Sequence, residues 1–184
     1  GVLALTRIGQ EGPVAALVDH PSRALRTAAV LVLRRMKSEK VALFLQDKDE
    51  YIVAEAARAI NDDLSIEKAL PALAATLSEK RFLSEPLLRR GISACLRVGG
   101  EKEMDILISF ADRKDLPAPI RAEALATLGG WANPSVLDRV DGRFRGKIER
   151  DPALVTAKVR TLANQILQSK DAEILVAGAQ MLSA

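Results

Sequence analysis

Residues 116–130, LPAPIRAEALATLGG, are the feature that most constrains the fold. Prolines at the start suit a loop and a first helical turn, and the closing glycine pair suits a helix C-terminus. Between them, apolar residues fall at i, i+4, i+5 and i+8, which is one stripe along a helix. We expect Arg121, Glu123 and Thr127 to face elsewhere. The stripe residues are Ile120, Ala124, Leu125 and Leu128.

The same four offsets recur three times upstream, where Leu25, Ile52 and Leu88 are the first stripe residues. Counted from these residues to Ile120, the copies start 27, 36 and 32 residues apart. Shorter apolar segments between the copies predict partner helices. Paired helices at a spacing of roughly 30 to 45 residues are typical of a helical solenoid, in which each pair buries its stripe against its neighbours.

The composition favours the same architecture. The chain has 29 Ala and 26 Leu against six aromatic residues, which suits closely packed helices better than a sheet. The longest apolar run covers only residues 28–33, so we expect no membrane span. We predict one all-α domain over residues 1–184, with a polar loop inserted at residues 141–151.

The two ends of the chain predict a piece of a longer protein. Gly1 is not a start methionine, and the apolar pattern continues to the C-terminal end of the sequence. The residues themselves do not indicate a cellular location.

A local excess of positive charge marks the predicted loop. Residues 139–150 carry five Arg and Lys against two Asp and Glu, an excess of three that equals the net charge of the whole chain. This stretch is a candidate for contact with phosphates or an acidic partner. We favour instead a solvated loop anchored by Phe144 and Ile148, because nucleic-acid surfaces usually offer stacking aromatics or a longer basic face. The candidate contact residues are Arg139, Arg143, Arg145 and Lys147.

Few residues suit catalysis or metal binding. His20 is the only histidine and precedes Pro21, which favours a turn residue over a metal ligand or a member of a triad. Cys95 lies between Ala94 and Leu96, which favours a core position over a nucleophile. We therefore expect no catalytic residue, cofactor or metal in this segment.

The dipeptides Leu25-Arg26 and Ile120-Arg121, each before an Ala-containing stripe, resemble the HEAT and armadillo-like repeat families. The first helices of those repeats commonly follow a turn with Asp or Pro and begin with an apolar residue and Arg. The resemblance covers roughly residues 13–140. It implies a right-handed α-α superhelix and a noncatalytic scaffold that contacts other domains or a protein partner.

A second resemblance concerns the parent protein. Residues 116–146, with HPSRALRTAAVLVL upstream, are similar to the HEAT-repeat region of large bacterial exported, membrane-bound (sorbosone-type) dehydrogenases. In those proteins the repeats lie between a β-propeller and a cytochrome c-like domain. This similarity implies a periplasmic or cell-surface parent with haem c outside the segment, and it assigns no catalytic residue here.

Two alternatives come from other HEAT-like families. The repeats also resemble the alkylpurine DNA glycosylases in architecture, which would make the four basic loop residues a nucleic-acid contact. HEAT-repeat metal hydroxylases place His-Glu pairs on their helices, and this chain has a single His. We set the hydroxylase aside and keep nucleic-acid binding as the alternative.

Overall fold

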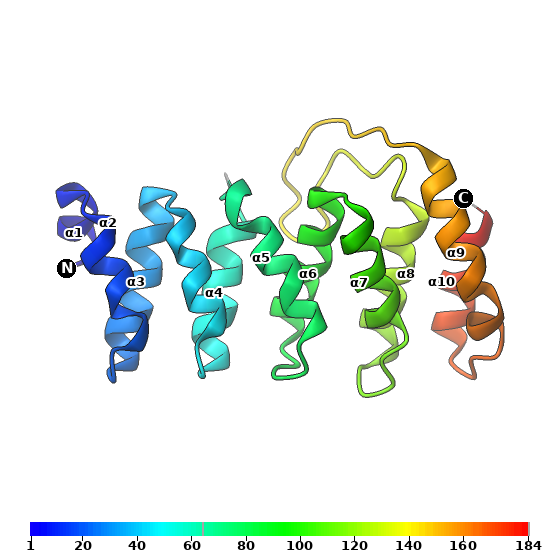
Figure 1. Ribbon diagram of the computed structural model, residues 1–184, viewed down its shortest axis with the longest axis horizontal. Helices are drawn as coiled ribbons and strands as arrows, with labels where there is room; N and C mark the ends of the chain where they lie inside the picture. The colour runs from blue at the N-terminus through cyan, green and yellow to red at the C-terminus, as the bar shows by residue number, and fades with distance from the viewer. Residues whose placement is uncertain (64, 184) are drawn as a thin grey trace.

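The computed structural model describes residues 1–63 and 65–183, and this part of the chain is all-helical. The helices lie side by side in a row, with α1 near one end and α10 near the other (Figure 1). The row contains α1 (Val2–Ile8), α2 (Glu11–Ala15), η1 (Ala16–Asp19), α3 (Arg23–Met36), η2 (Glu39–Gln46), α4 (Glu50–Asn61), η3 (Glu67–Ala69), α5 (Leu70–Ala75), η4 (Thr76–Ser78), α6 (Glu85–Val98), α7 (Glu101–Ala111), α8 (Ala118–Gly129), α9 (Pro152–Leu167) and α10 (Ala172–Ser183), where η marks a 3₁₀-helix.

The helices form two layers. Each of α3, α4, α6, α8 and α10 contacts the next in this order, and they make the first layer. The second layer contains η2, α5, α7 and α9. Because the chain alternates between layers, the first-layer helices run in the same direction (Figure 1). We call the edge where α3, α4, α6 and α8 end the upper edge, and the opposite edge the lower edge.

The four predicted stripes all lie in the first layer, and most of their residues are buried. Ala29, Ala56 and Ala124 are almost completely buried. Small side chains at buried positions suit closely packed helices.

Two stripe predictions were wrong. Leu25 is 44% exposed, and the buried side chain at this end of α3 is Arg26. In α8 the residues expected to face away, Arg121, Glu123 and Thr127, are buried as well. The reason is that α8 packs against α6, α7, α9 and α10, which leaves only the side with Pro119, Ala122 and Ala126 partly open to solvent.

Caps define several helix ends. The Ser22 hydroxyl accepts from Leu25 N at 3.4 Å, and Asp49 accepts from Tyr51 N at 3.0 Å. Asp47, which lies just before this cap, accepts from Arg26 Nε at 2.7 Å in a buried pair. Pro71 stands in the first turn of α5, where its missing N–H costs nothing.

Arginines connect successive helices at the lower edge. The last carbonyls of a helix lack intrahelical partners, and a cation near them is favourable. Arg81 Nη2 donates to Leu45 O at 3.1 Å, and Arg113 Nη1 donates to Glu79 O at 3.2 Å, in each case at the end of an earlier second-layer helix. These arginines therefore tie each helix pair to the one before it.

Replacing Ala124 by Leu tests the close packing of the first layer. The larger side chain has no space between α8 and its neighbours, so the free energy of unfolding should fall by about 1 to 3 kcal/mol. Urea denaturation measures this. The control is Ala157→Leu on the exposed side of α9, which should leave the midpoint unchanged. An unchanged midpoint for Ala124→Leu would mean that Ala124 is not on a packed face.

Candidate partner-binding surface

The segment after α8 folds back across the end of α6 and reaches the end of α4 (Figure 1). It is longer than the loop predicted at 141–151, since the irregular chain begins at Gly130. Leu137 and Phe144 form an isolated antiparallel bridge. Two hydrogen bonds flank it, from Asp138 N to Arg143 O and from Arg145 N to Val136 O, both 2.8 Å. We call residues 136–145 the hairpin.

One face of the hairpin points into the molecule. Arg145 Nε donates to Asp138 Oδ2 at 3.3 Å, and Ser93 Oγ donates to the same carboxylate oxygen at 3.0 Å. Arg145 also donates to Asn61 O at 2.9 Å and to Asp63 O at 2.6 Å. Because Asn61 is the last residue of α4, Arg145 caps a helix that is more than 80 residues away in the sequence.

Two further arginines cap helices at the upper edge. Arg97 Nη1 donates to Asn61 O at 3.3 Å. Arg150 donates to Leu96 O at 2.5 Å and to Trp131 O at 2.8 Å, and its guanidinium lies 5.0 Å from the centre of the Trp131 ring. Burial lowers the pKa of both Arg97 and Arg150, yet a guanidinium keeps its charge near neutral pH.

Asp63 joins the hairpin to α3. Its carboxylate accepts from Arg34 Nη2 at 2.6 Å and from Arg143 Nη2 at 2.9 Å. Its backbone N–H donates to Asp141 Oδ2 at 3.0 Å. The hydrogen bond from Arg34, supported by the charge of Arg143, lowers the pKa of Asp63 below the ordinary 3.8.

The other face of the hairpin points to solvent and is apolar. Phe144 is 72% exposed and Leu137 is 50% exposed. Side chains of directly opposed residues in an antiparallel pair lie on the same face, so these two form one apolar surface. The expectation that Phe144 anchors the loop was wrong, because Arg145 and Arg150 hold it instead.

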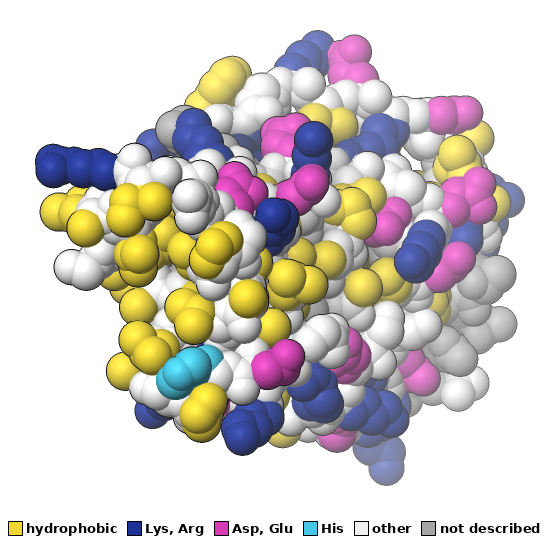
Figure 2. All heavy atoms as spheres, turned by 60° about the vertical axis from the view of Figure 1, so that its left-hand side comes forward, with side chains coloured by type: hydrophobic (Ala, Val, Ile, Leu, Met, Phe, Trp, Pro, Cys, Tyr) yellow, Lys and Arg dark blue, Asp and Glu magenta, His cyan; other side chains and the backbone are white. Residues whose placement is uncertain are grey.

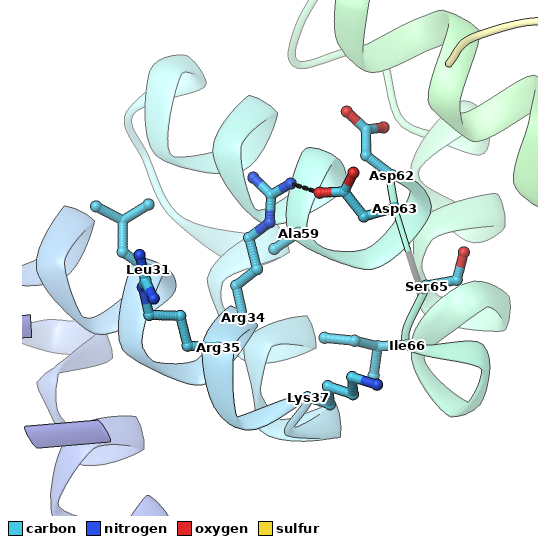
Figure 3. A pocket seen from close by; sticks show the side chains of 9 residues that line it. All are labelled: Leu31, Arg34, Arg35, Lys37, Ala59, Asp62, Asp63, Ser65 and Ile66. Carbon is cyan, nitrogen blue, oxygen red and sulfur yellow. Dashed lines mark hydrogen bonds and ion pairs between the residues drawn. The ribbon is translucent and has the colours of Figure 1, made fainter. Parts of the chain in front are cut away.

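Two depressions adjoin the hairpin. The first, of about 420 Å³, lies between the ends of α3 and α4 and has Arg34, Arg35 and Lys37 in its lining (Figure 3). The second, of about 650 Å³, is bounded by the hairpin and the start of α5. Asp63 and Ser65 line both depressions, so the two are adjacent. Together with the apolar face of the hairpin they form what we call the upper surface.

The structure separates the four basic residues singled out in the sequence. Arg143 and Arg145 meet at Asp63, where each already has a partner. Lys147 is exposed and pairs with Glu149 at 2.5 Å. Arg139 is exposed and lies beside a small cavity under the hairpin.

Sequence reasoning missed Asp63 and the basic group at the end of α3. These residues come together with the hairpin only in the folded chain. The run RRMK at positions 34–37 is the sequence signal that could have pointed to the basic group.

The other candidate residues have structural surroundings. His20 Nδ1 accepts from Ser22 N at 3.0 Å in a turn, as predicted. Cys95 is buried, and burial together with the nearby Glu103 raises the pKa of its thiol, which disfavours a nucleophilic thiolate. Among the described residues there is no cluster of His, Cys, Asp and Glu suited to a metal ion. No helix in this part of the chain has the length and apolar character needed to cross a bilayer.

Comparison with known proteins relates the chain to a fold only. No family model and no curated protein sequence matches it. The crystal structure of an engineered protein, a target of the Northeast Structural Genomics Consortium, is similar with a TM-score of 0.52 and 13% sequence identity. The similarity covers 99% of this chain and 81% of that chain. At such low identity it supports the helical fold and says nothing of function.

Replacing Arg145 by Ala tests how the hairpin is held. The change removes one donor from the α4 end and one from Asp138, so the free energy of unfolding should fall by about 1 to 3 kcal/mol. Chymotrypsin should then cut after Phe144 faster than in the unaltered protein. Lys147→Ala, which removes an exposed charge from the same loop, should change neither value. Equal cleavage rates for both variants would contradict the anchoring role.

The lowered pKa of Asp63 predicts a pH dependence. A carboxyl group whose pKa is lower in the folded state stabilises the fold above its ordinary pKa of 3.8, and the effect is lost as pH falls through the folded value. The stability difference between the unaltered protein and Asp63→Asn should therefore be present at neutral pH and shrink in acid. Urea denaturation across this range measures it, and a difference independent of pH would contradict the assignment.

Proposed function

We propose that this chain is a noncatalytic helical-repeat scaffold, built as a HEAT-like right-handed α-α superhelix, that binds a protein partner or another domain of its parent. The observation that carries the proposal is the hairpin. It exposes Leu137 and Phe144 while buried arginines hold it on the ends of α4 and α6. Large apolar side chains fixed in an exposed position are typical of interaction surfaces.

Repeated contacts support the HEAT-like part of the proposal. Arg26 and Arg121 follow the first stripe residue in α3 and α8, and both are buried. Arg26 pairs with Asp47 before the next first-layer helix, and Arg121 pairs with Asp171 before α10, with an N–O distance of 3.3 Å. The same residue type thus joins successive helix pairs at two places.

The test places a photo-crosslinking phenylalanine analogue at position 144 of the protein in its host cells. We expect crosslinks to one protein or to one other domain of the parent. The control position is 43 in η2, since Leu43 is 49% exposed but belongs to the second layer. Crosslinks to nucleic acid would favour the alternative function, and equal crosslinking from both positions would contradict a specific surface.

The nature of the parent is a separate proposal. The similarity of residues 116–146 to exported sorbosone-type dehydrogenases supports a bacterial parent in the periplasm or at the cell surface, with haem c outside this segment. The purified parent should then show a haem absorption band and a C-x-x-C-H motif in its flanking sequence. Absence of both would contradict this origin without affecting the scaffold proposal.

A further inference from the structure

The arginines and lysines of the upper edge fall into two groups. Arg97, Arg145 and Arg150 are largely buried and donate to helix carbonyls, so they have little capacity for a partner. Arg35 and Lys37 are exposed, and within the described ranges the side chain of neither has a hydrogen-bond or ion-pair partner. They are the cations in the lining of the first depression whose side chains remain available to a partner.

The two available cations, Arg35 and Lys37, line the first depression. Figure 3 shows Arg34 turned toward Asp63, while Arg35 and Lys37 lie away from that pair in the same lining. Because two guanidinium groups already neutralise the Asp63 carboxylate, it repels an anion less than a bare carboxylate would. The first depression therefore favours negative charge.

The second depression offers apolar contact. Phe144 and Ile148 line it together with Leu70. The two depressions adjoin at Asp63 and Ser65, so cations at the end of α3 lie on the same surface as the exposed apolar side chains of the hairpin.

We infer that the partner surface binds an acidic peptide segment that carries an apolar side chain. The apolar side chain packs against Phe144, and the carboxylates face Arg35 and Lys37. This inference rests on the proposed function and specifies the chemistry of the partner. Charge complementarity identifies the occupant, since the open cations gather at one end and the exposed apolar residues at the other.

The same surface suits a nucleic acid less well. A phosphate backbone carries a charge at every nucleotide and needs a continuous basic face. Here the acidic residues Asp62, Glu67 and Asp141 lie among the cations and interrupt the basic face. The residue paired with Phe144 in the hairpin is the aliphatic Leu137, which offers no second aromatic ring for base stacking. A short acidic peptide segment carries fewer charges than a nucleic acid, and its carboxylates lie only beside the cations.

Fluorescence anisotropy with the 184-residue chain tests the inference. The probe is a short labelled peptide of Asp, Glu, Gly and Ser with one central Leu-Phe pair. A second probe replaces Leu-Phe by Ser-Ser, and a third is single-stranded oligothymidine of equal charge. The protein variants are Phe144→Ser and the double variant Arg35→Ala/Lys37→Ala. The matched control, Lys80→Ala/Lys102→Ala, removes the same charge from two exposed residues beside a separate depression.

The first probe should bind, and each of the two upper-surface variants should weaken it by about tenfold while the control leaves it unchanged. All the altered side chains are exposed, so circular dichroism should show an intact fold. Equal binding of the Ser-Ser probe, equal loss in the control, or tighter binding of oligothymidine would overturn the inference. Absence of peptide binding would overturn it too, while crosslinks from position 144 to a protein would still support the scaffold.

Discussion

Hydrogen bonds from arginine to helix C-terminal carbonyls are the interaction on which the rest of this structure depends. A row of short helices has many ends, and each end leaves carbonyl groups that need donors. Arg81 and Arg113 supply donors at the lower edge, and Arg97, Arg145 and Arg150 supply them at the upper edge. Each of these contacts joins segments more than 30 residues apart, so the capping groups also hold helix pairs together.

This role changes the interpretation of the basic segment after α8. In the sequence, the positive charge of this segment suggests a binding site. In the structure, Arg145 and Arg150 donate to carbonyl groups of α4 and α6. Arg143 neutralises Asp63 and fixes the tip of the hairpin. The segment presents the apolar pair Leu137 and Phe144 to solvent together with Arg139 and Lys147, and the cations beside the first depression come from the end of α3.

The sequence predicted the local features of the fold well. Ser22 begins α3 and Gly99 ends α6 in the left-handed conformation, as capping rules require. Four apolar stripes identified the first-layer helices. These features depend on residues within a few positions of each other, which periodicity and turn chemistry describe.

The remaining features depend on contacts between distant segments. The burial of Arg26 requires Asp47, and the burial of Arg121 follows from the helices that surround α8. The hairpin meets α4 through Arg145, and no local pattern marks Asn61 and Asp63 as its partners. For that reason the sequence predicted a loop anchored by Phe144 and Ile148, whereas contacts from arginines hold it and leave Phe144 exposed.

Hydrogen–deuterium exchange along residues 136–145 tests the central claim most directly, namely that the hairpin is a fixed platform. The amides of Asp138 and Arg145 donate across the bridge, whereas in such a pair the amide of Phe144 points away. The account predicts slow exchange at Asp138 and Arg145 and fast exchange at Phe144. Uniformly fast exchange through the segment would show a mobile loop and contradict the account.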